Sequence, residues 1–141
     1  PSHIRHVFTV NTLAYLIKGG RLSKFKGNLA EALDMKPVLI VDEAGSLQVL
    51  KTVRGHKKSL KSLVEYAEEN GAELEKQLVS VCHGEDGEAL RFVTDLIKER
   101  LHPADIMVSV VGCAIGAHTG RGIIGVCFLD APEDPYMEYL S

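Results

Sequence analysis

The chain carries no strong excess of charge of either sign. Its 141 residues include 16 Lys and Arg against 19 Asp and Glu, which leaves a formal net charge of −3. Proteins that bind nucleic acid need a basic surface to neutralise phosphates. The composition therefore gives no reason to expect nucleic acid or an acidic lipid surface as a partner. The run of basic residues Lys57, Lys58 and Lys61 is a local exception, which we interpret as the solvated face of a helix.

Cysteine is scarce, with three residues at positions 82, 113 and 127 and no C-x-x-C pair. An odd number in apolar, strand-like settings indicates buried, reduced thiols rather than a disulfide framework. Cys82 and His83 are neighbours, but no second Cys or His pair stands at the spacing of a metal site. We therefore predict no bound metal.

Motifs that hold a cofactor or a catalytic serine are also absent. The glycine-rich stretch 112–125 lacks the Gly-Lys-[Ser/Thr] ending of a phosphate-binding loop. A strand rather than a helix is expected after it, which disfavours a dinucleotide-binding motif. Ser80 and Ser109 lie in expected strands, outside any G-x-S-x-G sequence. We predict that the protein needs no cofactor.

No apolar run is long enough to span a bilayer, and the chain opens without a signal peptide or an initiating Met. We expect a cytoplasmic protein and, because the Met is missing, a fragment or a processed product. With 141 residues and no internal repeat, the chain is long enough to bury one hydrophobic core. We predict a single domain over residues 1–141.

Apolar patterning predicts about six strands and four helices. We expect strands over residues 5–10, 38–41, 47–53, 78–82, 106–111 and 123–129, and helices over about 12–18, 23–34, 56–70 and 84–101. The turn 42–45 joins two strands into an antiparallel hairpin. The hairpin and the varied connections favour an α+β (or α/β) fold in which helices cover a mixed or antiparallel sheet.

The same patterns predict which side chains are buried. On the helix over 56–70 these are Leu60, Leu63, Val64 and Ala67, and on the helix that ends near 101 they are Ala89, Val93, Leu96, Ile97 and Leu101. In the strand over 47–53, strict alternation would place Leu47, Val49, Lys51 and Val53 on one face.

The most unusual stretch is 112–125, which holds five of the 13 glycines around His118. One interpretation is a tight strand–turn–strand connection in which the histidine is incidental. The other is a backbone cradle that presents His118 and nearby N–H groups to an anionic or polar ligand. Arg21, after Gly19-Gly20, suits recognition of a carboxylate or phosphate, or is a surface arginine at a helix end. Thr119 is the third unusually placed polar residue.

Four motifs carry a resemblance to a known family. They are Leu13–Ser23 (LAYLIKGGRLS), Met35–Leu39 (MKPVL), Lys51–Arg54 (KTVR) and Ile115–Gly122 (IGAHTGRG). In this order they resemble the C-terminal domain of the DegV family of bacterial fatty-acid-binding proteins. The resemblance runs from about Val7 to Phe128.

The resemblance implies a carrier that has no catalytic residues of its own. Members have two α/β domains with a long-chain fatty acid buried between them, and in several of them a fatty acid kinase phosphorylates the carboxylate for phospholipid synthesis. The N-terminal domain supplies a serine and a threonine, and the C-terminal domain an arginine and a histidine, here Arg21 and His118. We accordingly expect Arg21, His118, Thr119 and Gly120 to bind the ligand, with Arg21 and His118 on the same side of the domain.

Two departures from the family pattern bear on these expectations. Arg121 stands where the family usually has proline, which removes a restraint on φ and adds a cation beside His118. The N-terminal domain is absent from the sequence, so we expect the chain alone to bind fatty acid poorly. We also expect a possible dimer through the apolar face left bare.

Two other function classes stay open at this point. One is an acyl- or phosphoryl-transfer enzyme with His118 as general base and Arg21 as electrostatic clamp. The other is a module that binds a protein and no small ligand.

Overall fold

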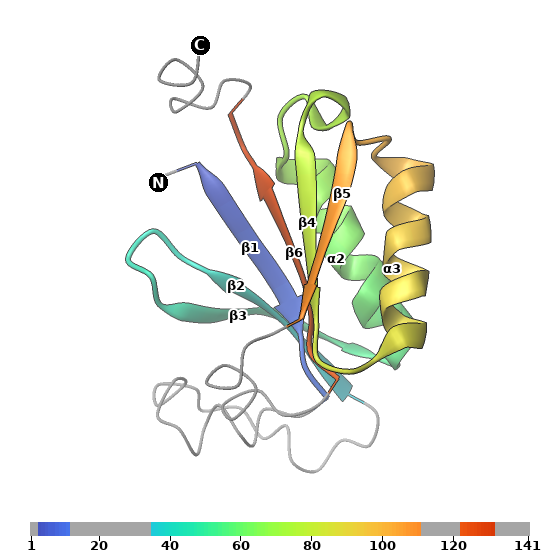
Figure 1. Cartoon of the computed structure of the whole chain (residues 1–141). Coiled ribbons are helices and arrows are strands. Elements are labelled where there is room, and N and C mark those ends of the chain that lie inside the picture. Colours follow the sequence, from blue (N-terminus) through green and yellow to red (C-terminus); the bar gives the residue numbers. More distant parts are fainter. Residues whose placement is uncertain (1–2, 12–34, 111–121, 132–141) are drawn as a thin grey trace.

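Two helices cover one face of a six-stranded sheet in the computed structural model of the chain (Figure 1). The structure describes residues 3–11, 35–110 and 122–131. Its strands are β1 (Ile4–Thr9), β2 (Met35–Val41), β3 (Leu47–Arg54), β4 (Leu78–His83), β5 (Asp105–Val110) and β6 (Ile124–Leu129). Its helices are α2 (His56–Asn70), α3 (Gly87–Arg100) and the short 3-10 helix η2 (Leu74–Lys76). The helices predicted over 12–18 and 23–34 lie outside the described residues.

The strand order is β3-β2-β1-β6-β4-β5. Only β4 and β5 are parallel, and every other neighbouring pair is antiparallel. The predicted mixed sheet of an α+β fold is therefore confirmed. The central pair, β1 and β6, joins a hairpin side (β2 and β3) to a β4–α3–β5 unit in which the helix connects the two parallel strands.

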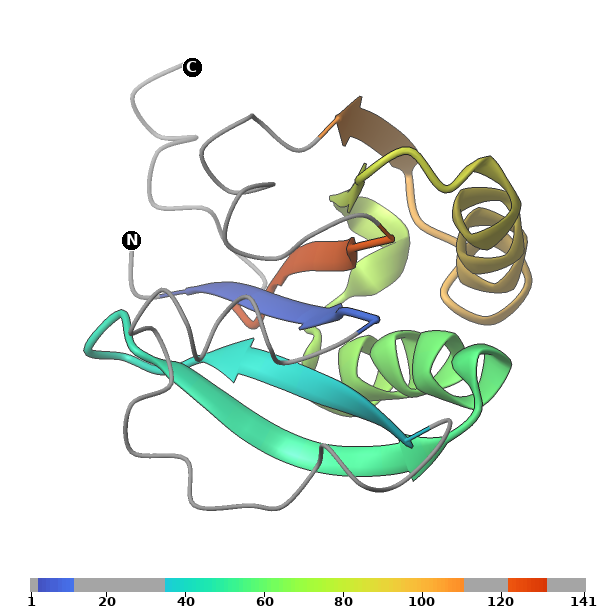
Figure 2. The same cartoon turned by 90° about the horizontal axis from the view of Figure 1, so that it is seen from below.

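The main core lies between the sheet and the helices, and Figure 2 shows these two layers from below. The predicted α2 residues Leu60, Leu63, Val64 and Ala67 are all buried there. From α3, Ala89, Val93 and Ile97 join them, while Leu96 is only partly buried at its border. The alternate residues of the central strands face this layer, and they include Val7, Val38, Val79, Val81, Ile124 and Val126.

A smaller cluster lies on the other face of the sheet. Val10, Leu39 and Ile123 are buried in it, and Phe8 packs against them. Val38 and Leu39 are adjacent residues of β2 that point to opposite faces, and neither has any exposed surface. This confirms that β2 is covered on both faces, as its continuous apolar run predicted.

The predicted alternation along β3 is wrong in its second half. Leu39 pairs with Val49 but Val38 pairs with Lys51, so Leu50 is an extra residue in β3. Such a bulge reverses the direction of the side chains that follow it. As a result Val49 packs in the small cluster, whereas Val53 packs against the main core on the opposite face.

Strand β2 also begins earlier than expected. The sequence predicted a strand from residue 38, yet Met35, Lys36 and Pro37 are the first three residues of β2 and pair with β3. Proline is tolerated here because the pairing with β1 ends at Val38, so no neighbour on that side requires a Pro37 N–H. The Pro37 carbonyl accepts a hydrogen bond from the buried Thr9 hydroxyl at 2.7 Å.

Candidate functional site

All four predicted ligand-binding residues lie outside the described residues. Arg21 belongs to the segment 12–34, and His118, Thr119 and Gly120 belong to the segment 111–121. Their roles therefore stay predictions. What the structure describes is where each of these two segments leaves the sheet and where it returns.

Both segments leave and return at one end of the sheet, the lower end in Figure 1. Thr9, near the start of the first segment, pairs with Ile124, just after the second. At the same end of the sheet, His83 of β4 pairs with both Ile124 and Val110, the residue before the second segment. Because β2 runs antiparallel to β1, its first residue, Met35, lies at this end as well. We call this the segment end of the sheet.

Hydrogen bonds fix the root of the second segment to the end of β4, and one close contact joins it to the root of the first. The Gly84 N–H donates to the Ile123 carbonyl at 2.9 Å, and the Gly122 N–H donates to the Gly84 carbonyl at 3.0 Å. Gly122 has a φ of 85° and lies against the side chain of Asn11, where a Cβ would clash with the amide group. One glycine of the stretch 112–125 thus has a backbone conformation that other residues rarely adopt, which either a tight turn or a ligand cradle requires.

Both α helices begin at the segment end. Helix α2 follows β3 and α3 follows β4, so the positive ends of their dipoles lie there. Asp86 caps α3 by accepting the Ala89 N–H at 3.0 Å, and its second oxygen lies 3.5 Å from His56 Nε2. Helix α2 has neither a side-chain cap nor an acidic residue in its first turn, which instead contains Lys57 and Lys58. The start of α2 therefore favours an anionic group, whereas the start of α3 already carries acidic side chains.

His83 and Cys82 do not form a joint ligand pair, because adjacent strand residues point to opposite faces. The Cys82 sulfur fills the space above Gly125 on the face away from the helices. His83 Nδ1 is buried without a hydrogen-bond partner in the structure as described. Among the described residues no cluster of His, Cys, Asp or Glu has the arrangement of a metal site.

The thiols that the structure describes are free and half-buried. Burial raises the pKa of Cys82, and burial together with the nearby Cys82 raises the pKa of Cys127 to about 11. Both side chains are therefore neutral thiols at physiological pH and poor nucleophiles. Cys113 lies outside the described residues.

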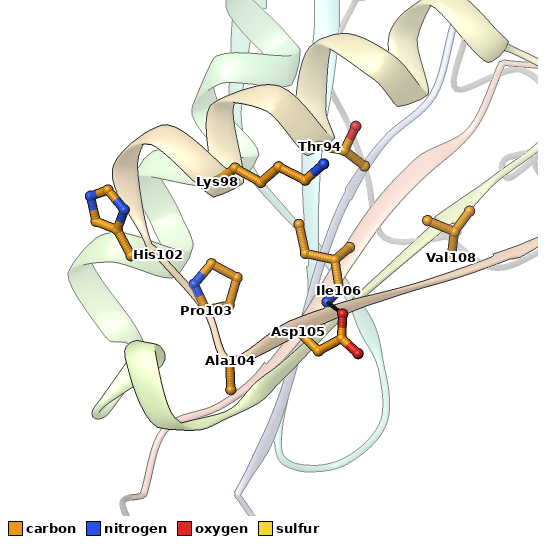
Figure 3. Close-up of a pocket in the computed structure, with 8 residues that line it drawn as sticks. All are labelled: Thr94, Lys98, His102, Pro103, Ala104, Asp105, Ile106 and Val108. Atoms are coloured by element: carbon orange, nitrogen blue, oxygen red, sulfur yellow. Dashed lines mark hydrogen bonds between the residues drawn. The ribbon is translucent and has the colours of Figure 1, made fainter.

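Sequence reasoning missed a cavity at the opposite end of the sheet. It has a volume of about 630 Å³ and lies between α3 and the edge strand β5 (Figure 3). Thr94 and Lys98 line it from the helix, and Ile106 and Val108 from the strand. The valines of β5 gave no signal of this cavity in the sequence, because an apolar residue in a strand is normally assigned to a core. The structure shows instead that they are exposed.

The chain matches the family model described as "Uncharacterised protein, DegV family" over residues 1–131. The chain belongs to the DegV family. The resemblance found in its motifs is thereby confirmed. None of the helices described in the structure is long and apolar enough to cross a membrane.

Its similarity to individual DegV proteins covers most of this chain but only about half of theirs. A DegV domain-containing protein of Clostridium perfringens is 34% identical over 92% of this chain and 45% of the relative. A Thermotoga maritima protein named fatty acid-binding protein is 31% identical over 84% of this chain and 41% of the relative. A DegV family protein from Eubacterium eligens, solved with heptadecanoic acid, has a TM-score of 0.79 and 26% identity over 92% of this chain and 46% of that structure.

Proposed function

We propose that this DegV chain binds the carboxylate end of a long-chain fatty acid and acts as part of a carrier, without catalysis of its own. The observation that carries the proposal is the shared root of the segments 12–34 and 111–121. Thr9 pairs with Ile124, and Gly122 packs against Asn11. The segment that contains Arg21 therefore begins beside the point where the segment that contains His118 ends. Two segments that are far apart in the sequence are thus rooted at one place.

Electrostatics at this place support an anionic ligand. A helix N-terminus is equivalent to roughly half a positive charge, and α2 begins here without a side-chain cap, whereas α3, which also begins here, already has acidic residues at its start. In the first turn of α2, Lys57 and Lys58 add formal positive charge where helices normally carry acidic residues. A fatty acid carboxylate would complement this charge, with Arg21 as its bidentate partner and His118 as a hydrogen-bond donor.

Names of relatives support the choice of ligand. The Thermotoga maritima relative is named a fatty acid-binding protein, and the Eubacterium eligens structure was solved with heptadecanoic acid. We propose the same ligand class here, with a protein of about twice this length needed to enclose the acyl chain. Handing the carboxylate to a fatty acid kinase, in the cytoplasm, remains a proposal that rests on the family resemblance.

Titration with a fluorescent long-chain fatty acid tests the proposal. We expect Arg21→Ala and His118→Ala each to weaken binding by about tenfold or more, as expected for loss of a charge-assisted hydrogen bond. His102→Ala is the matched control, because His102 lies beside the cavity at the opposite end of the sheet. An equal loss in all three variants would show that the proposed carboxylate site is wrong.

Joining this chain to an N-terminal DegV domain provides the second test. Each buried methylene of the acyl chain contributes about 0.8 kcal/mol, so a two-domain protein should bind far more tightly than the chain alone. Equal affinity of the two would show that this chain holds the fatty acid unaided. It would overturn the two-domain part of the proposal and leave the carboxylate site intact.

A further inference from the structure

The two edges of the sheet are built differently. On the β3 edge, the bulge at Leu50 interrupts regular pairing, and Gln48, Lys51 and Arg54 place polar or charged side chains along the strand. Bulges and basic residues are the usual protection of an edge strand against another strand. The β3 edge is therefore blocked.

The β5 edge has no such protection. It is the last strand of the sheet, and no strand in the described part of the chain pairs with its outer side. Its sequence, Asp105–Val110, contains no Lys, Arg or Pro, and its pairing with β4 is regular over all six residues. Met107, Val108 and Val110 are 50%, 47% and 67% exposed. Exposed aliphatic side chains on a regular edge strand favour addition of a further strand.

We propose that the β5 edge binds the β5 edge of a second copy of this chain, antiparallel and across a two-fold axis at Val108. In a continuous sheet, paired residues must point to the same face. With the axis at Val108, Val108 pairs with its own equivalent and Ile106 pairs with Val110 of the copy on the helix-covered face. Met107 pairs with Ser109 of the copy on the other face.

The side chains of β5 suit this pairing. Every pair on the helix-covered face joins two β-branched aliphatic residues, a combination that stabilises neighbouring strands. Asp105, the one charged residue of β5, stays outside the ladder, where its carboxylate accepts the Ile106 N–H at 2.8 Å. No like charges are therefore brought opposite each other within the paired strands.

The cavity between α3 and β5 supplies room for the copy. Ile106 and Val108 form its strand side, with Thr94 and Lys98 opposite on α3 (Figure 3). In the proposed pairing, Val110 of the copy lies beside Ile106, at the mouth of this cavity. Its exposed side chain is then buried against the flank of α3. A second copy thus covers the mouth of the cavity with the same strand that lines it, as a two-fold interface requires.

Sedimentation velocity of the 141-residue chain, over a wide range of concentration, tests the dimer. We expect a concentration-dependent dimer in the wild type and a dissociation constant raised by about tenfold or more in Val108→Lys, because two ammonium groups would meet on the axis. Leu50→Lys is the matched control, since Leu50 is 42% exposed on the opposite edge. It should dimerise like the wild type. If Val108→Lys does not fold by circular dichroism, Val110→Lys replaces it.

Cross-linking tests the axis itself. Oxidised Val108→Cys, made in a Cys113→Ser background, should form a disulfide-linked dimer on a non-reducing gel, while Cys113→Ser alone, with its half-buried Cys82 and Cys127, should not. A wild type that stays monomeric at every concentration would overturn the proposal. A dimer that survives Val108→Lys or is broken by Leu50→Lys would do the same. A dimer that resists the cross-link would refute the axis at Val108.

Discussion

The two ends of the sheet have opposite designs. The segment end carries two helix N-termini and the roots of the segments 12–34 and 111–121. The other end, which we call the clamped end, is closed by hydrogen bonds between side chains and backbone. The Gln77 amide there donates to the carbonyls of Ala72 and Leu129 at 2.9 and 3.1 Å, and its oxygen accepts the Leu129 N–H at 2.8 Å. The difference separates an end whose contacts stabilise the fold from the end where we propose that the ligand binds.

An ion-pair cluster adds to the clamped end. The Arg5 Nε donates to Asp130 Oδ2 at 2.6 Å, and His3 Nδ1 lies 3.2 Å from Asp130 Oδ1. These residues join the start of β1 to the end of β6. The Arg5 hydrogen bond, more than the contribution of His3, lowers the pKa of Asp130. If the comparison is right, changes at the clamped end should alter stability, and changes at the segment end should alter ligand binding.

The largest effect should come from Gln77. Replacing Gln77 with Ala removes three hydrogen bonds to half-buried backbone groups, so we expect the free energy of unfolding to fall by about 2 kcal/mol. Urea unfolding measures this loss. Gln48→Ala is the control, because Gln48 is exposed and its side chain bonds only to Asp42, at 3.0 Å. A similar loss in both variants would mean that the clamped end has no special role.

Gly122 offers a smaller effect at the segment end. Ala at this position must keep a φ of 85° and displace the Asn11 side chain, so we expect a loss of roughly 1–2 kcal/mol in the free energy of unfolding. The same variant should also weaken fatty acid binding, because it moves the roots of both segments. Gly87→Ala is the control, since a Cβ on Gly87 meets no atom within 4 Å. Unchanged fatty acid binding in Gly122→Ala would show that the roots of the two segments do not position the ligand site.

Asp130 should give the smallest effect, and it depends on pH. Its pKa is lowered in the folded chain, so its ion pairs stabilise the fold above the unfolded pKa and are lost as pH falls through the folded pKa. Arg5 is 38% exposed, and solvent screening limits the gain to less than about 1 kcal/mol. Melting temperatures of the wild type and Asp130→Asn should differ at about pH 7 and converge toward about pH 2. A difference in melting temperature that does not change with pH would exclude the ion pairs of Asp130 as its cause.

Periodicity predicted the helix-covered half of the fold well. Helix α2 spans His56–Asn70, as expected, because its apolar spacing and the Asn70-Gly71 stop are both local signals. The bulge at Leu50 left no such signal. It is defined by the pairing of β3 with β2, which brings Val49 and Lys51 opposite adjacent residues of β2. Pairing of this kind depends on residues that are distant in the sequence.

The candidate site was predicted from motifs rather than from physical patterns. Composition and spacing singled out Arg21 and His118 as unusual, but only the family resemblance gave them a common ligand. The structure adds what neither could give, namely that Thr9 and Ile124 are paired, so that the two segments share a root. The unpaired outer side of β5 in the described sheet was missed for a related reason. The order of the strands depends on pairing between residues that are distant in the sequence.

The central pairing of β1 with β6 has a consequence for how the protein is made. Ile4 pairs with Leu129, and six successive pairs join the two strands. On a ribosome, β1 can pair with β2 early, but its pairing with β6 waits until residue 129 has left the exit tunnel. The β1–β2–β3 part of the sheet and the β4–α3–β5 unit emerge earlier, and in the described sheet no strand other than β6 pairs with both of them. The last strand to be synthesised is the one that joins them, and a nascent chain cut short before β6 has no means of completing its sheet.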